Sequence, residues 1–342
     1  MREILKGIYS VTLFNTEDKQ GVKDINVYIV KGNDRSLMID TGFNRENCPE
    51  TFESALEELD IEPGNLDIFI THRHFDHCSL AGFLSGKGAT VYMNSEEERH
   101  SYDCLTYKPG IHTLEEQDAV LKRNGINLEP DSLKGFRKFN RILSSGGNRF
   151  LAIDPFPYRD VKAGDIFSYG EYVFSAFPLK GHTYGQMGLI DRNKKILFCA
   201  DQVIEGVSPI VATTFSGENL LNGFFMSLKD IKENYSDFTL IPAHGVIIGN
   251  PSETIDRIME SYDRKIEKTR EILREKKKPL TVLETARALY NYYSFPENPG
   301  DFFIFKMVIT KTASILEYLF STEEIGKETK EGTEYYSYSL MP

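Results

Sequence analysis

The chain has 342 residues, of which 40% are hydrophobic and 27% are charged, a balance that is ordinary for a globular protein with a sizeable core. Its formal net charge is −11, which argues against nucleic acid as the main partner because an acidic surface repels phosphate backbones. There is no run of about 18 apolar residues, so no membrane partner is expected. Four scattered cysteines and the lack of a secretory signal predict reduced thiols in a cytoplasmic protein.

The first half of the chain alternates short apolar strands with helices. Strands are predicted at 25–30, 37–40, 66–71 and 90–93, and helices at 51–59 and 79–85. The strand at 66–71 is apolar at four of its six positions, which is typical of a buried strand, and it leads directly into a histidine-rich stretch.

A second group of strands begins near residue 165. Hairpins are predicted over 166–177 and 187–199, followed by a strand at 238–241. Strands and helices repeated in this way predict an α/β protein in which two sheets pack together under a cover of helices. The intervening residues 102–158 are rich in charge, so we predict an insertion there, either a substrate-shaping lid or an inert excursion, with helices at 114–123 and 131–142.

After Pro251 the composition changes. Helices are predicted at 252–278, 280–290 and 304–320, and a small hairpin at 325–338. Because this is the order of elements in a winged-helix domain, we predict a catalytic domain over residues 1–253 and a winged-helix-like C-terminal domain over 254–342. The basic residues at 270–278 alternate with glutamates, which favours a role in packing, lid formation or dimerisation over DNA binding.

Several potential metal ligands follow the predicted buried strands. His72, His74, Asp76 and His77 fall within six residues after the strand at 66–71. So many polar side chains cannot face a core without partners, whereas on a loop they can converge on a metal. Imidazole and carboxylate groups suit zinc, iron and manganese. Three further candidates each follow an apolar strand, namely His182, Asp201 and His244.

The order of these motifs resembles the metallo-β-lactamase superfamily. The resemblance rests on Asp-Thr-Gly at 40–42, His-x-His-x-Asp-His at 72–77, Gly-His-Thr at 181–183, Asp201, and Ala-His-Gly at 243–245. It implies an αββα sandwich whose ligand set is similar to that of glyoxalase II, the acyl-homoserine lactonases and the RNase Z group. The C-terminal region resembles that of the lactamase-β-2-like branch.

The resemblance also implies a role for each candidate residue. His72, His74 and His182 would bind a first metal ion, Asp76, His77 and His244 would bind a second, and Asp201 would bridge the two. A hydroxide would also bridge the ions, with Asp76 orienting it as the catalytic residue. Asp40 would support the ligands from behind. Tyr184 is a candidate substrate contact, although a tyrosine in this position is more often a packing residue.

The predicted function is a dinuclear metal-dependent hydrolase acting on a small thioester or ester, similar to hydroxyacylglutathione hydrolases. Two divalent metal ions are expected, with zinc preferred over iron or manganese. A lactonase, a phosphodiesterase or ribonuclease, and a nucleic-acid-binding protein acting through the C-terminal domain remain as alternatives. We prefer a small acyl substrate because a chain of net charge −11 without a basic arm is poorly suited to gather polyanions. Homodimerisation is left open.

Overall fold

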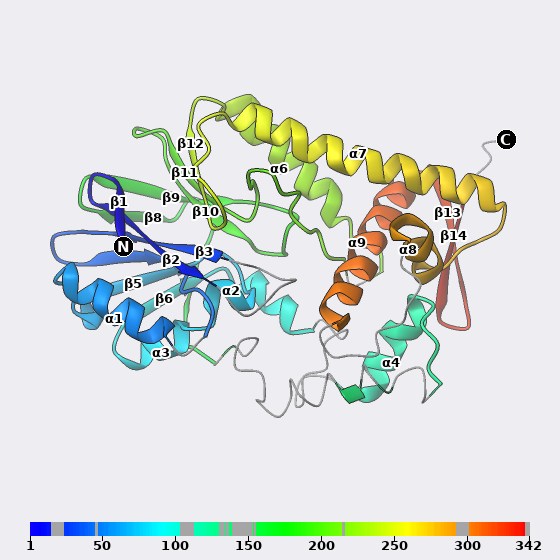
Figure 1. Ribbon diagram of the computed structural model, residues 1–342, viewed down its shortest axis with the longest axis horizontal. Coiled ribbons are helices and arrows are strands. Elements are labelled where there is room, and N and C mark those ends of the chain that lie inside the picture. Colours follow the sequence, from blue (N-terminus) through cyan, green and yellow to red (C-terminus); the bar gives the residue numbers. More distant parts are fainter. Residues whose placement is uncertain are drawn as a thin grey trace.

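Two β-sheets pack face to face, and helices lie on the outer side of each (Figure 1). This computed structural model describes residues 1–14, 24–44, 47–102, 113–129, 134, 137–138, 153, 155–213, 216–291 and 301–338.

The first sheet contains seven strands. Their order is β1 (Arg2–Leu5), β2 (Ile8–Phe14), β3 (Asp24–Val30), β4 (Ser36–Ile39), β5 (Leu66–Ile70), β6 (Thr90–Met93) and β7 (Arg159–Asp160). Neighbours are antiparallel from β1 to β4 and parallel from β4 to β7. Helices α1 (Cys48–Glu58) and α3 (Ala81–Gly86) cover its outer face, where Phe52 and Leu84 share a buried cluster with Ile68. The parallel pairing brings the carboxyl ends of β4, β5 and β6 to one edge.

The second sheet contains five strands. Their order is β12 (Thr239–Pro242), β11 (Ile196–Ala200), β10 (Met187–Asp191), β9 (Tyr172–Pro178) and β8 (Ile166–Tyr169). The pairs β8–β9 and β10–β11 are the two predicted hairpins, and β11 pairs with β12 in parallel. Helices α6 (Leu220–Asn234) and α7 (Pro251–Lys276) pack on the outer side, where Phe224 and Ile258 share a buried cluster with Leu197.

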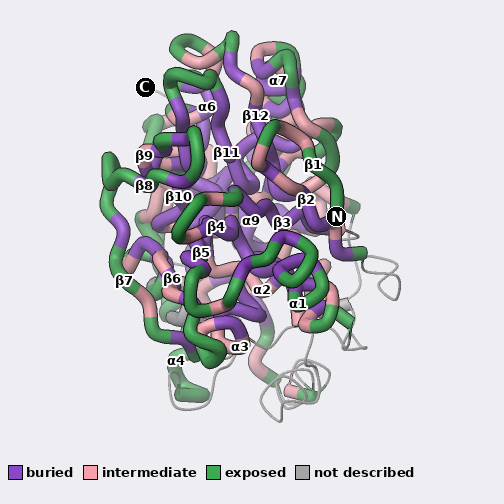
Figure 2. The backbone as a smooth tube through the Cα atoms, turned by 90° about the vertical axis from the view of Figure 1, so that its left-hand side faces the viewer, coloured by how far each residue is buried: buried purple, intermediate pink, exposed green. Residues whose placement is uncertain are grey.

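Aromatic contacts join the two sheets. The ring of Phe69 lies edge-on to Phe167 with 5.3 Å between centroids, and Tyr28 lies 5.3 Å from Phe198. Figure 2 shows buried positions running through both sheets. Helix, sheet, sheet and helix layers therefore stack in the order that the sequence predicted.

The C-terminal region has the predicted order of elements. It continues from α7 through α8 (Val282–Tyr290) and α9 (Asp301–Ser321) to the hairpin β13 (Ile325–Lys330) and β14 (Thr333–Tyr338). Helix α8 begins two residues later than predicted because Thr281 caps it with a capping box and Leu280 pairs with Tyr336. Its winged-helix character and the domain boundary at 253/254 stay predictions.

Other elements were missed or lie outside the described ranges. The sequence patterns gave no bounds for β1, β2, β7 or α6. The remaining short elements are η1 (Pro63–Asn65), α2 (Phe75–Cys78), η2 (Ser95–Tyr102) and α4 (Leu114–Arg123). Helix α4 agrees with its prediction, whereas most of the predicted helix at 131–142 and much of the insertion at 102–158 lie outside the described residues.

Two further expectations concern thiols and membranes. Cys48, Cys78 and Cys199 are buried thiols, and Cys104 lies outside the described residues. Within the described ranges, no helix combines the length and the apolar character that crossing a membrane requires.

Candidate metal centre

All seven predicted ligands converge at the edge where strands of both sheets end. The segment after β5 supplies four of them, partly through the short helix α2. The other three follow β9, β11 and β12. Their potential ligand atoms fall into two groups, in each of which all atoms lie within 4.8 Å of one another: His72, His74, His182 and Asp201 in one, and Asp76, His77 and His244 in the other.

The first group is a triangle of imidazoles. Nδ1 of His74 lies 2.9 Å from Nε2 of His72 and 3.2 Å from Nε2 of His182. Three ring nitrogens that face one point at such distances form the kind of ligand triad that binds a transition metal. His72 and His182 are buried, whereas His74 is partly exposed.

The second group combines a carboxylate with two imidazoles. Oδ2 of Asp76 lies 3.5 Å from Nε2 of His244 and 3.9 Å from Nε2 of His77. His77 is fully buried and Asp76 is 4% exposed, so their charges are largely removed from water.

Asp201, which belongs to the first group, also faces the second group. Its Oδ1 is 3.5 Å from Nε2 of both His77 and His244, whereas its Oδ2 is 3.6 Å from Nε2 of His182. One carboxylate therefore faces each group with a different oxygen, which is the arrangement a bridging ligand needs.

Hydrogen bonds on the outer side orient three of the rings. Nδ1 of His77 lies 2.8 Å from Oδ2 of Asp40, Nδ1 of His182 lies 2.7 Å from the Ile210 carbonyl, and Nδ1 of His244 lies 2.5 Å from the Asp24 carbonyl. Because each Nδ1 faces an acceptor, it carries a proton, so the neutral ring directs the lone pair of Nε2 toward the centre. Asp40 itself accepts from the Thr71 amide and hydroxyl, at 2.8 and 2.9 Å.

The cluster holds strongly perturbed ionisable groups. Burial alone would lower the pKa of His244, but Asp201 and Asp76 outweigh it and raise this pKa to about 9. Burial likewise opposes the shift at His77, whose pKa Asp201, Asp40 and Asp76 nevertheless raise. Burial would raise the pKa of Asp76, yet the positive charges of His77 and His244 lower it. The carboxylates are therefore held ionised beside the imidazoles.

Three inward-facing atoms lack a hydrogen-bond partner among the described residues: Nε2 of His77, Nε2 of His244 and Oδ1 of Asp201. Buried polar atoms are normally satisfied, so such a group needs an explanation. A divalent cation bound between these atoms would satisfy all three. The donor set, imidazole nitrogen with carboxylate oxygen, fits zinc, iron or manganese.

The backbone takes uncommon conformations where it delivers these side chains. Asp40 has a φ of 62° and Ala200, which precedes Asp201, has a φ of 47°. Non-glycine residues in this region cost about 1–3 kcal/mol each and persist only where surrounding contacts impose them. Gly181, which precedes His182, has a φ of 108°, and a side chain there would meet the α6 backbone at 2.3 Å from the Phe224 nitrogen.

Glu97 is a site residue that the sequence patterns did not reveal. It is fully buried in η2, and burial raises its pKa. Its Oε2 accepts from the Arg73 amide at 2.8 Å, and its Oε1 accepts from the Thr183 hydroxyl and the Gly185 amide, both at 2.6 Å. One carboxylate therefore ties the loop of His72 and His74 to the loop of His182.

Two further predicted features are Tyr184 and the insertion at 102–158. The hydroxyl of Tyr184 donates to Oε2 of Glu218 at 2.6 Å, and its contact with substrate stays a prediction. Helix α4, the described part of the insertion, packs against the C-terminal hairpin, and the Asn124 carbonyl after it accepts from the Leu283 amide at 3.0 Å.

Comparisons with curated proteins connect this geometry to known relatives. The acyl-coenzyme A thioesterase MBLAC2 of Gallus gallus is 30% identical over 186 residues, which are 53% of this chain and 58% of that protein. The hydroxyacylglutathione hydrolase GloC of Haemophilus influenzae is 24% identical over 215 residues, covering 61% of this chain and 80% of that protein. The chain thus spans less than two thirds of the length of the thioesterase it matches.

Solved structures share the fold over nearly the whole chain. A metallo-beta-lactamase family protein from Thermus thermophilus has a TM-score of 0.77 at 19% identity and covers 98% of this chain and 100% of its own. A beta-lactamase domain protein from Burkholderia ambifaria has a TM-score of 0.78 at 18% identity, covering 99% and 94%. A family model described as the metallo-beta-lactamase superfamily matches residues 21–244, which contain all seven predicted ligands. This protein belongs to the metallo-beta-lactamase superfamily.

Proposed function

We propose that this protein is a dinuclear metal-dependent hydrolase that cleaves a small thioester or ester. The observation that carries the proposal is the position of Asp201, whose two oxygens face two separate groups of ligand atoms. A single-metal site would need only one of these groups.

Each group would hold one ion. His72, His74 and His182 would bind the first ion, Asp76, His77 and His244 the second, and Asp201 both. When bound, two such ions, most simply zinc, supply a water whose pKa falls toward about 7 and a Lewis acid for an acyl carbonyl.

The side chains of the chain would prepare this chemistry. Asp76 is held ionised by His77 and His244, so its carboxylate can accept a hydrogen bond from the attacking water and orient it. Asp40 and the Ile210 and Asp24 carbonyls fix the imidazoles behind it, so little reorganisation is needed during the reaction.

A thioester is the preferred substrate class for two reasons. The relatives named above are an acyl-coenzyme A thioesterase and a hydroxyacylglutathione hydrolase, so both names describe an acyl group on a carrier. Thiols ionise near pH 8.5, so a thiolate departs without help from a strong general acid. The cytoplasmic location and the homodimer stay predictions beside this proposal.

An activity screen of the purified, metal-loaded full-length protein tests the assignment. The panel contains acyl-coenzyme A and acylglutathione thioesters, a simple ester, lactones, a phosphodiester and RNA. We expect the highest kcat/KM on a thioester, with that activity lost in the Asp201→Ala variant, which serves as the control for contaminating enzymes. Faster cleavage of a lactone, phosphodiester or RNA would overturn the substrate ranking, and full activity of the variant would overturn the metal mechanism.

A further inference from the structure

The segment at 209–213 lies directly behind the candidate metal centre. Its Ile210 carbonyl oxygen is the acceptor for Nδ1 of His182, at 2.7 Å. The direction of this carbonyl therefore decides how the His182 ring is turned and where its Nε2 lies.

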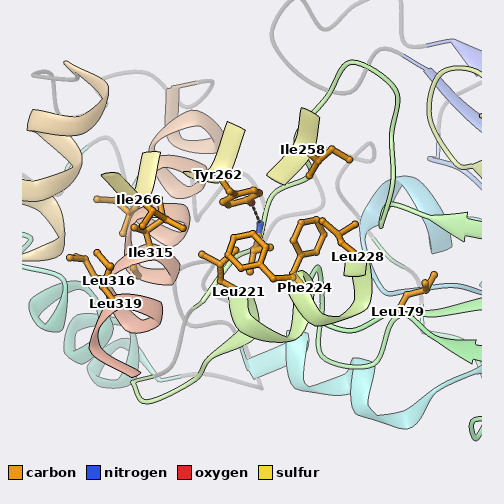
Figure 3. Close-up of a cluster of buried hydrophobic side chains, with 14 of the residues drawn as sticks. Leu179, Leu221, Phe224, Leu228, Ile258, Tyr262, Ile266, Ile315, Leu316 and Leu319 are labelled. Carbon is orange, nitrogen blue, oxygen red and sulfur yellow. Dashed lines mark hydrogen bonds between the residues drawn. The ribbon is translucent and has the colours of Figure 1, made fainter. Parts of the chain in front are cut away.

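Tyr262 of α7 holds the same segment from the opposite side. Its hydroxyl donates to the Pro209 carbonyl at 2.6 Å and accepts from the Val211 amide at 3.2 Å. Figure 3 shows the tyrosine reaching toward this segment from among the buried side chains of α6, α7 and α9. The side chain is fully buried, and its ring lies 5.8 Å from that of Phe224 and 5.6 Å from that of Phe225.

The two contacts meet on one peptide group. The Val211 amide and the Ile210 carbonyl belong to the same planar unit, and in a trans peptide they point in opposite directions. Tyr262 bonds to one end of this plane and His182 to the other, so the plane cannot rotate without breaking a hydrogen bond.

A second C-terminal residue supports the segment one step further on. Oγ of Ser314, on α9, lies 2.7 Å from the Val211 carbonyl and accepts from the Thr213 amide at 2.9 Å. Two separate helices beyond residue 253 thus fix the stretch of backbone that orients His182.

We propose that Tyr262 is a positioning residue for His182 and acts through the peptide group between Ile210 and Val211. This inference rests on the proposed function, in which His182 binds the first ion. It gives the C-terminal helices a part in metal binding, since they complete the support of the first ligand group from behind.

The test compares two tyrosine variants of the full-length protein. Tyr262→Phe keeps the ring but removes the hydroxyl that holds the Pro209 carbonyl and the Val211 amide. Tyr336→Phe is the matched control, because it removes a buried C-terminal hydroxyl whose hydrogen bonds go to Glu317 and Glu334 instead of this segment. Zinc is titrated in competition with a chromophoric chelator, which yields two dissociation constants for each protein.

We expect Tyr262→Phe to weaken one of the two dissociation constants by about tenfold and to leave the other unchanged, as the loss of support behind a ligand does elsewhere. Tyr336→Phe should leave both constants unchanged. Constants in Tyr262→Phe within about twofold of the wild type, or equal losses in the two variants, would overturn the proposal.

A metal-free measurement separates this inference from the proposed function. The Nδ1 proton of His182 is observed by NMR in histidine-labelled protein, with His182→Gln for assignment. Tyr262→Phe should shift this signal or speed its exchange, and an unchanged signal would overturn the inference. A wild-type protein that binds no zinc would overturn the proposed function alone, because the NMR signal reports on the contact without metal.

Discussion

Two buried polar clusters lie at opposite ends of β5. At its start, Asp67 is 5% exposed and accepts from Nε and Nη2 of Arg35, at 2.9 and 2.6 Å, and from the Tyr169 hydroxyl at 2.7 Å. Beyond its end, at His72 and the residues after it, stands the candidate metal centre. One end of this strand therefore carries a polar cluster whose carboxylate is fully hydrogen-bonded, and the other end leads into a cluster in which several atoms have no hydrogen-bond partner among the described residues.

The difference lies in how completely each cluster is satisfied. Both oxygens of Asp67 accept hydrogen bonds within the protein, whereas Nε2 of His77, Nε2 of His244 and Oδ1 of Asp201 have no hydrogen-bond partner among the described residues. A satisfied buried network stabilises the fold, whereas an unsatisfied one costs stability unless something from outside completes it. Burial of charge thus does not by itself indicate a site, whereas several buried ligand atoms that face one another without hydrogen-bond partners do.

The largest effect should follow loss of the shared carboxylate. Asp201→Ala removes a ligand from both groups, so both ions should be lost and turnover should fall by about 10³-fold or more, since bound metal contributes several kcal/mol to the transition state. Elemental analysis and kinetics on the same preparation measure this. Retention of one full equivalent of metal would show that Asp201 does not serve both groups.

A strong pH dependence of metal binding should come next. Burial lowers the pKa of His244, but Asp201 outweighs this effect, and the pKa of about 9 keeps the metal-free imidazole protonated at neutral pH. A metal must displace that proton and also the proton of His77, whose pKa is raised as well, so affinity should rise by at least about tenfold for each pH unit from 6 up to about 9. Calorimetry in two buffers of different ionisation enthalpy counts the released protons, and an affinity that is flat across this range would contradict the assignment.

A smaller effect is expected from the residue that joins two ligand loops. Glu97→Gln places an amide group against the donors of Arg73, Thr183 and Gly185, so binding of the first ion should weaken by about 10- to 100-fold. Glu96→Gln is the matched control, because Glu96 is exposed. Equal metal affinity of the two variants would remove Glu97 from the site.

The smallest effect on metal binding belongs to the other end of β5. Asp67→Asn should leave metal content and kcat unchanged while lowering the free energy of unfolding by about 2 kcal/mol, the loss of charge-assisted hydrogen bonds. Urea denaturation measures the stability. If this variant also loses metal, the two clusters are coupled through the strand, and the claim that Asp67 serves stability alone would be wrong.

The ligand loops were predictable because their chemistry is local in the sequence. His72, His74, Asp76 and His77 follow one apolar run, and a short turn after a buried strand can point all of them the same way. Local sequence could not show that these residues meet His182. That expectation came from the order of the motifs along the chain, and the structure places His182 beside His72 and His74.

Glu97 could not have been found in this way. It stands between Glu96 and Glu98, and a run of three glutamates is typical of a solvated surface. Only the fold shows that the middle one turns inward while both neighbours stay exposed. The link from Tyr262 to Val211 spans 51 residues and was equally invisible, because it arises from helix packing rather than from a motif.

Helix α6 was missed for a different reason. Its sequence is apolar, but Asn222 and Gly223 near its start weaken the helical pattern, and both favour turns when judged alone. The packing of Phe224 and Leu228 against the second sheet and α7 overrides that local preference.

The buried cluster shared by α6, α7 and α9 has a thermodynamic consequence. Phe224 lies before the predicted boundary at 253/254, whereas Ile258 and Ile315 lie after it, and all belong to one core. Each such side chain contributes about 1.5–3 kcal/mol on burial, so neither region keeps its stability once the other unfolds. On heating we therefore expect a single cooperative melting transition in calorimetry. The regions before and after residue 253 should not give separate transitions.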